Sequence, residues 1–113
     1  MKRLTRLTGI ELIRIERQRQ IESENYTSNH DDALHDGALA IAGACYVFDI
    51  VSSYKTLDKN WSDRYWEVRK SYFPFDDRYF KPTWEDPIKQ LTKAGALIAA
   101  EIDRLQRAKS RQK

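Results

Sequence analysis

The chain contains few of the residues that build several common kinds of site. It has one cysteine among its 113 residues, which excludes an intramolecular disulfide and a zinc site built from cysteines. Its four glycines are too few for a glycine-rich phosphate-binding loop of the usual kind. No strand-rich segment and no internal repeat is found. We therefore expect one helical domain over residues 1–113, near the size at which assembly into an oligomer helps to bury a core.

Long apolar runs are also absent. The first nine residues, Met-Lys-Arg-Leu-Thr-Arg-Leu-Thr-Gly, contain no apolar signal-peptide core. The longest apolar run, residues 37–50, includes Asp49 and is too short to span a bilayer. From these patterns we expect a cytoplasmic protein without a membrane partner.

The net charge of +3 is concentrated at one end of the chain. The basic tail, residues 104–113, carries five cations and no acid: Arg104, Arg107, Lys109, Arg111 and Lys113. Cations suit the carboxyl end of a helix, so the tail is typical of a solvated helix terminus. Because the rest of the chain is close to neutral, nucleic-acid binding is not expected.

The first predicted helix covers residues 9–24. Thr8 and Glu11 have the spacing of a capping box, which marks its start. Its apolar stripe consists of three isoleucines: Ile10, Ile13 and Ile21. Arg17 falls in the middle of this stripe and Gln20 at its edge. A guanidinium keeps its charge, so Arg17 must either pair internally with an acid, extend its charge to solvent or contact an anionic ligand.

The second predicted helix covers residues 32–52, with Asp31 or Asp32 as its N-cap. Beyond residue 37 its only charged side chain is Asp49. A helix that is apolar nearly all round is expected to be central and covered by others. A stripe of small residues should let another helix approach closely: Ala33, Gly37, Ala40 and Ala44.

The third predicted helix covers residues 87–107, and Pro87 suits its first turn. Apolar residues recur at heptad spacings of three, four, three, four and three: Ile88, Leu91, Gly95, Ile98, Ile102 and Leu105. We expect this seam to face the core and Leu97 to lie away from it. Leu97, together with Leu12 and Ile15 of the first helix, would then leave apolar surface exposed, which favours a homo-oligomer.

Between the second and third helices lies an aromatic-rich segment, residues 61–84, which holds nine of the thirteen aromatic residues. Pro74 and Pro82 interrupt it, and it has no sustained helix or strand period. Three interpretations stay open: a loop packed over its own helices, an oligomer interface, or a surface that stacks on a planar ring while basic residues contact phosphate. The predicted fold class is mainly α, a compact bundle of three principal helices with a long aromatic-rich irregular connection.

The polar segment His30-Asp31-Asp32-Ala-Leu-His35-Asp36 has spacings that a helical metal site could use, because His35 lies three residues from Asp32 and four from Asp31. Acids also gather at helix N-termini for dipole reasons alone. Capping, ligand recognition and metal binding are therefore the alternatives here. We expect no metal and no cofactor.

Several segments together resemble a family of small accessory proteins from phages and prophages. They are Gly9-Ile-Glu-Leu-Ile, Glu16-Arg-Gln-Arg-Gln-Ile21, His30-Asp-Asp32, Phe73-Pro-Phe-Asp-Asp77 and Leu91-Thr-Lys-Ala-Gly-Ala-Leu-Ile-Ala-Ala-Glu-Ile-Asp-Arg-Leu105. The phage context implies a role in interaction with the host. One known way in which phage proteins act on the host is to form compact homo-oligomers that trap nucleotide immune signals, such as cyclic dinucleotides and ADP-ribose derivatives.

The preferred function is accordingly sequestration of a nucleotide-like small molecule. Phosphate needs fixed cations, ribose diols suit carboxylates and bases need flat apolar faces. The candidate ligand-binding residues are Arg17, Gln20, His30, Asp31, Asp32, Phe75, Lys81, Trp84 and Lys93.

Two alternatives remain. One is a metal-dependent nucleotide pyrophosphohydrolase of the all-α MazG-like kind. Such enzymes carry acidic pairs spaced Glu-x-x-Glu and Glu-x-x-Asp on two helices, and this chain departs from that pattern in its second and third helices. The other alternative is direct blockade of a host protein by the aromatic surface.

Overall fold

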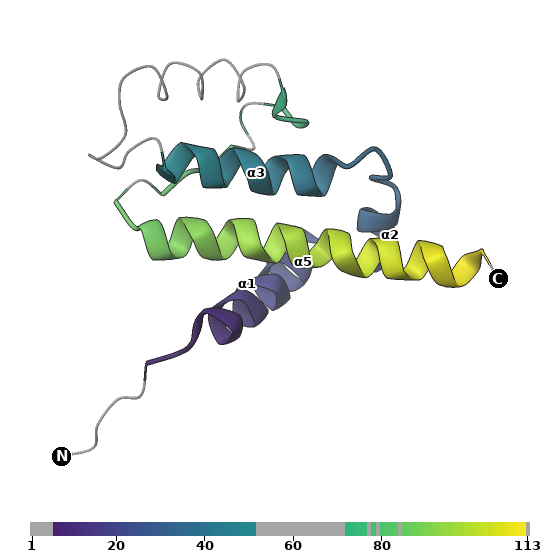
Figure 1. Cartoon of the computed structure of the whole chain (residues 1–113), viewed down its shortest axis with the longest axis horizontal. Coiled ribbons are helices and arrows are strands. Elements are labelled where there is room, and N and C mark those ends of the chain that lie inside the picture. The colour runs from purple at the N-terminus through teal and green to yellow at the C-terminus, as the bar shows by residue number, and fades with distance from the viewer. Residues whose placement is uncertain (1–5, 52–71, 77, 79, 84, 113) are drawn as a thin grey trace.

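The computed structural model describes residues 6–51, 72–76, 78, 80–83 and 85–112. These residues form a mainly α structure, as predicted, with four helices: α1 (Gly9–Glu24), α2 (Ser28–Asp32), α3 (Ala38–Val51) and α5 (Pro87–Arg111). Figure 1 shows α3 and α5 side by side in opposite directions, with α1 crossing α5 steeply. Most of the predicted aromatic segment, residues 61–71 together with Tyr79 and Trp84, lies outside the described residues.

The long helix α5 is the platform against which α1, α2 and α3 all pack. Asp86 caps it by accepting from the Lys89 amide, and Pro87 occupies its first turn as predicted. The buried core joins α3 to α5 and consists of Leu39, Ala42, Tyr46, Ala94, Leu97 and Ala100. At Gly43 the two helices come so close that an added Cβ would lie 3.2 Å from the Ala94 carbonyl oxygen. Gly43 is therefore a site of close packing.

A buried amide links three segments of the fold. The side chain of Gln90 on α5 is fully buried. Its Nε2 donates to the Tyr46 carbonyl oxygen at 3.2 Å and to Asp49 Oδ2 at 2.7 Å, while its Oε1 accepts from the Thr83 amide. The single charged residue of the apolar helix α3 is thus satisfied inside the protein, and residues 80–83 are held against both helices.

Helix α1 has the predicted bounds and the predicted capping box. The Glu11 amide donates to Thr8 Oγ1 at 3.2 Å, and the Thr8 amide donates to Glu11 Oε1 at 3.0 Å. Helix α5 ends at Arg111, so the predicted end at residue 107 was too early and most of the basic tail is helical.

The predicted second helix was wrong at its start. Helix α2 ends at Asp32 and α3 begins at Ala38, because Gly37 has a φ of +86°, in the left-handed region that a continuous α-helix cannot contain. The N-cap of α2 is Thr27, whose hydroxyl accepts from the His30 amide, so neither Asp31 nor Asp32 has that role. Residue 52 lies outside the described part of the chain.

The predicted orientation of the heptad seam was also wrong. Leu97 is buried, whereas five seam residues are between 40% and 67% exposed: Ile88, Leu91, Ile98, Ile102 and Leu105. Helix α3 packs instead on the face of α5 that carries Ala94 and Leu97, because small residues there allow the close approach at Gly43.

Two other predicted stripes need correction. Ile10 of α1 is 82% exposed, so the inward stripe of α1 begins at Ile13. The alanines of the predicted small-residue stripe (Ala33, Ala40 and Ala44) are exposed, since α3 faces α5 with Leu39, Ala42 and Gly43.

None of the helices in the described part of the chain has the length and the apolar character that a membrane span would need.

The contact between α1 and α5 generates a stability prediction. A Cβ at Gly95 would lie 2.5 Å from Cδ1 and 2.8 Å from Cγ1 of Ile13. Gly95→Val should therefore destabilise the fold by about 1–3 kcal/mol through overpacking, measured by thermal or urea unfolding. Such a loss lowers the midpoint by several degrees or more in a domain of this size.

Two controls accompany this measurement. Gly9→Val on α1 should cost much less, because nothing lies within 4 Å of a Cβ there. Adding Ile13→Ala to Gly95→Val should restore part of the loss by making room. A Gly95→Val protein as stable as the original chain would contradict the packing described.

Candidate functional site

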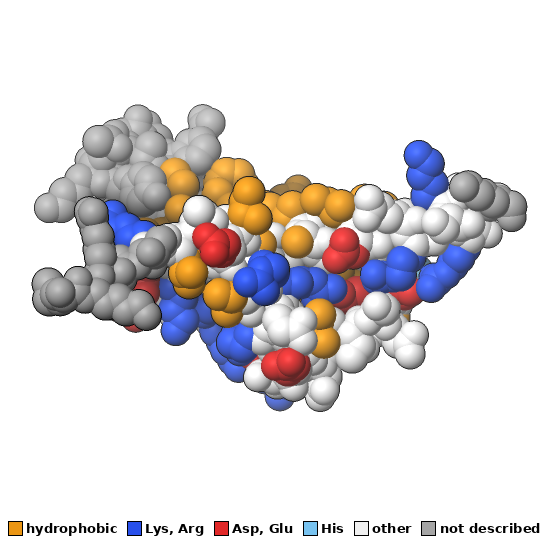
Figure 2. All heavy atoms as spheres, turned by 90° about the horizontal axis from the view of Figure 1, so that it is seen from below, with side chains coloured by type: hydrophobic (Ala, Val, Ile, Leu, Met, Phe, Trp, Pro, Cys, Tyr) orange, Lys and Arg blue, Asp and Glu red, His pale blue; other side chains and the backbone are white. Residues whose placement is uncertain are grey.

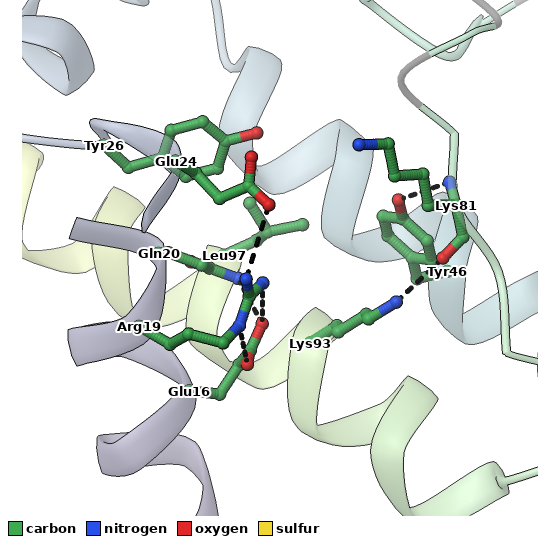
Figure 3. A pocket seen from close by; sticks show the side chains of 9 residues that line it. All are labelled: Glu16, Arg19, Gln20, Glu24, Tyr26, Tyr46, Lys81, Lys93 and Leu97. Carbon is green, nitrogen blue, oxygen red and sulfur yellow. Dashed lines mark hydrogen bonds and ion pairs between the residues drawn. The ribbon is translucent and has the colours of Figure 1, made fainter. Parts of the chain in front are cut away.

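Two adjoining hollows open between α1, α3, α5 and the segments that carry Phe73, Phe75 and Lys81. The charged hollow has a volume of about 70 Å³ and is lined by Glu16, Arg19, Gln20, Glu24, Tyr26, Tyr46, Lys81, Lys93 and Leu97. The aromatic hollow has a volume of about 310 Å³ and is lined by Glu24, Tyr26, His30, Ala42, Tyr46, Phe73, Phe75 and Leu97. The two share Glu24, Tyr26, Tyr46 and Leu97, so we treat them as one cleft with two compartments. Figure 3 shows the charged compartment with its side chains converging from α1, α3 and α5.

One wall of the charged hollow is an ion-pair cluster on the last turns of α1. Arg19 donates through Nε to Glu16 Oε1 at 2.7 Å and through Nη2 to Glu16 Oε2 at 2.9 Å. A longer contact of 3.4 Å joins Arg19 to Glu24 Oε1. The hydrogen bonds to Glu16 raise the pKa of Arg19. The cation of this wall is therefore already matched by two carboxylates.

The opposite wall carries cations without such a match. Lys93 Nζ donates to the backbone carbonyl oxygen of Lys81 at 2.8 Å, as Figure 3 shows. Within the described residues, neither lysine forms a salt bridge with a carboxylate. Burial lowers the pKa of Lys93, and the charge of Lys89 lowers it further. Lys93 is thus a partly desolvated ammonium group whose charge an anion would stabilise.

Gln20 supplies an unsatisfied acceptor at the same place. Its side chain is 4% exposed, and its Nε2 donates to Glu16 Oε2 at 3.3 Å. Its Oε1 is buried and has no hydrogen-bond partner among the described residues. A buried carbonyl without a donor costs free energy, so a ligand hydroxyl or amino group that donates to Gln20 would be favoured.

The aromatic hollow is lined by flat rings in several orientations. The rings of Tyr26 and His30 stack with centroids 4.6 Å apart and an interplanar angle of 5°. Phe73 meets both Tyr46 and Phe75 edge to face, at centroid distances of 6.5 and 5.9 Å. These rings offer apolar faces to a planar group, and the volume is at the lower end of the range for small-molecule sites.

Arg17 and Asp31 form the support behind His30. Arg17 Nη2 donates to Asp31 Oδ2 at 2.9 Å and Nη1 donates to the Tyr26 carbonyl oxygen at 3.2 Å. The other oxygen of Asp31, which is fully buried, lies 2.7 Å from His30 Nδ1. The structure therefore gives Arg17 an internal acid, and this pair fixes the stack of Tyr26 and His30 at the cleft.

Asp32 lies at a different place. Arg107 donates to its Oδ1 at 2.8 and 3.0 Å, and Arg111 donates to its Oδ2 at 2.8 Å. These hydrogen bonds, Arg107 first, lower the pKa of Asp32. Asp32 therefore joins α2 to the carboxyl end of α5 and does not line either hollow.

The structure thus brings five of the predicted ligand-binding residues into the cleft: Gln20, Lys81 and Lys93 in the charged hollow, and His30 and Phe75 in the aromatic one. Arg17 and Asp31 stand behind it, and Trp84 lies outside the described residues. Sequence reasoning missed the lining residues Glu16, Arg19, Glu24, Tyr26 and Tyr46. For Glu16 and Arg19, the i, i+3 spacing beside Gln20 was the available signal.

Within the part of the chain that the structure describes, no three histidine, cysteine, aspartate or glutamate side chains come together as a metal site would need.

Comparison of the chain with protein-family models, curated proteins and solved structures finds no match.

The pair behind the cleft generates the second prediction. Because Asp31 is fully buried, Arg17→Ala leaves its carboxylate without a cation and should cost about 3–5 kcal/mol of stability, measured by thermal unfolding. Arg14→Ala in the same helix, at an exposed position, should change stability by no more than about 0.5 kcal/mol. An Arg17→Ala protein with an unchanged midpoint would show that the pair does not hold this wall.

Proposed function

We propose that the chain is a phage-encoded counter-defence protein. It binds a nucleotide-derived immune signal, of the ADP-ribose type or a cyclic nucleotide, in the cleft and sequesters it without cleavage. It acts in the cytoplasm of the infected bacterial host. The resemblance of several segments to phage and prophage accessory proteins supports the biological setting, and the chemistry of the cleft supports the ligand class.

The observation that carries the proposal is the juxtaposition of two unlike compartments. Among the described residues, the ammonium group of Lys93 has no carboxylate partner and the nearby side-chain carbonyl oxygen of Gln20 has no donor, and the volume of the charged hollow suits a compact oxyanion. The aromatic hollow adjoins it and suits a planar ring. A molecule that joins phosphate to a nucleobase has both groups within a short distance.

The carboxylates of the cleft complete the match to a nucleotide. Glu24 lines both hollows, so it lies where a ribose would connect the phosphate to the base. Carboxylate oxygens accept hydrogen bonds from hydroxyl groups, and a ribose offers them as a diol. Glu24 has only a 3.4 Å contact to Arg19 among the described hydrogen bonds, which leaves acceptor capacity for such hydroxyls.

Binding without cleavage is supported by the sequence pattern. The all-α pyrophosphohydrolases hold magnesium with acidic pairs three residues apart on two helices, and this chain lacks those pairs in its second and third predicted helices. Of the acids of the cleft, Glu16 accepts two hydrogen bonds from Arg19, and Glu24 has a longer contact of 3.4 Å with it. Their role in this proposal is therefore to accept hydrogen bonds.

The test is titration calorimetry of the full chain with ADP-ribose and with cyclic di-GMP as probes, beside AMP and pyrophosphate. At least one of the two signal-type probes should bind more tightly than pyrophosphate, because pyrophosphate has no planar ring for the aromatic hollow. Lys93→Ala should weaken that binding by about tenfold to a hundredfold, the usual loss for a hydrogen bond to a charged group.

Lys89→Ala is the matched control, because Lys89 lies one turn earlier on α5 and is exposed. It should leave the affinity within about twofold. Equal losses in both variants would mean that only the general positive charge of α5 matters. Heating the complex should release the intact probe, and recovery of a cleaved product would establish the enzymatic alternative instead.

A further inference from the structure

The fold holds the ring of His30 from one edge and leaves its other edge toward the cleft. Nδ1 of His30 lies 2.7 Å from Oδ1 of Asp31, and the ring stacks on Tyr26. Asp31 is fully buried, whereas the side chain of His30 is 36% exposed. The edge that carries Nε2 therefore points away from Asp31 and from the protein interior.

The partners of Asp31 decide which nitrogen of His30 carries the proton. Arg17 Nη2 donates to Asp31 Oδ2 at 2.9 Å, and a guanidinium keeps its charge, so Asp31 is an ionised carboxylate whose charge is already matched. An ionised carboxylate only accepts hydrogen bonds. Nδ1 of His30 must therefore donate to it, and in the neutral ring Nε2 is left with a lone pair and acts as an acceptor.

This acceptor stands at the edge of the aromatic hollow. Among the described residues, Nε2 of His30 has no hydrogen-bond partner. His30 lines the aromatic hollow and not the charged one, whereas Lys93 lines only the charged hollow and Glu24 lines both. The part of a bound nucleotide that meets His30 is therefore its planar base. A base whose edge carries a donor is favoured there, because it satisfies the lone pair of Nε2.

We propose that Nε2 of His30 accepts a hydrogen bond from the exocyclic amino group of a nucleobase that fills the aromatic hollow. The inference rests on the proposed function and narrows its ligand class to nucleotides with an amino-bearing base such as adenine. Asp31 and Arg17 are positioning residues, because they fix the proton on Nδ1 and do not line the hollow. Aromatic faces accept any planar base, whereas a fixed acceptor at the edge of the hollow discriminates between bases.

NMR of the ring nitrogens tests the tautomer in the full chain without ligand, at about pH 8, where an ordinary imidazole is neutral. The chain has two histidines, and the His30→Phe variant assigns the signals. We expect the proton on Nδ1 of His30 and a lone pair on Nε2, which resonate far apart in a neutral ring. A proton on Nε2, or on both nitrogens, would overturn the proposal before any ligand is added.

Titration calorimetry with AMP and with purine riboside monophosphate tests the recognition of the amino group. The two probes differ only in the exocyclic amino group and carry the same phosphate. Attraction to the Lys and Arg side chains that form a row across one face of the molecule in Figure 2 is therefore the same for both. The full chain should bind AMP about threefold to tenfold more tightly, the usual net effect of one hydrogen bond.

Asp31→Asn tests the positioning role. Arg17 only donates, so it takes the amide oxygen of the new side chain, and the amide nitrogen then donates to Nδ1 of His30. The proton of the ring moves to Nε2, which becomes a donor. This variant should lose the preference for AMP and show a protonated Nε2 by NMR.

His30→Phe tests the same residue even where Asp31→Asn fails to fold, because it retains a ring beside Tyr26. It should bind the two probes with equal affinity. His35→Phe is the matched control, since His35 is exposed and lines neither hollow, and it should keep the preference for AMP.

Distinct outcomes separate the recognition of the amino group from nucleotide binding itself. Equal affinities of the original chain for the two probes would overturn the role of His30 and leave the proposed function standing. Lack of binding by any nucleotide probe would overturn the proposed function, and the base recognition with it. A preference for AMP that survives in His30→Phe would show that another residue contacts the amino group, and the assignment to His30 would be wrong.

Discussion

The fold depends on the packing of α1, α2 and α3 against one long helix, α5. Because α1 and α3 pack on different sides of α5, other sides of this helix stay open. One side lines the cleft with Lys93 and Leu97, and another exposes Ile98, Ile102 and Leu105. The helical period distributes the side chains of α5 over these sides.

Buried polar contacts set the positions of the connecting segments. Gln90 satisfies Asp49 and holds residues 80–83 against α3 and α5, and the Arg17–Asp31 pair holds α1 against α2. Apolar packing alone is tolerant of small displacements, whereas hydrogen bonds in a buried site are lost when geometry changes. These contacts therefore determine where Lys81 and His30 stand, and with them the shape of the cleft.

The fold class, the bounds of α1 and the inward position of Arg17 could be predicted, because capping chemistry and helical period are local properties. The position of Gly37 in the left-handed region was not foreseen, since glycine is compatible with both a helix and its interruption. The heptad seam gave the wrong core face because its period identifies a stripe but not the partner that covers it. The face with alanines and Gln90 is the buried one, and that choice depends on Gly43 and Asp49 of another helix.

The candidate site was predicted in part for the same reason. The sequence indicated Arg17, Gln20 and His30 as candidate ligand-binding residues, but it did not show which residues they contact. Tertiary contacts decide that Asp31 pairs with Arg17 and that Gln20 Oε1 has no donor among the residues the structure describes. Glu16 and Arg19 read as a surface ion pair until the neighbouring walls of the cleft are in place.

The attachment of α1 has a consequence for the dynamics of the molecule. α1 is held by its packing on α5 and by the Arg17–Asp31 ion pair to α2, whereas α3 shares with α5 both the core and the Gln90 network. Regions with fewer buried contacts open with lower free energy than the core, so the amide hydrogens of α1 would exchange with solvent before those of α3 and the middle of α5. Anything that fills the cleft touches α1 and the α3–α5 unit at once, and would therefore slow exchange most in α1, which contributes no residue to the buried α3–α5 core.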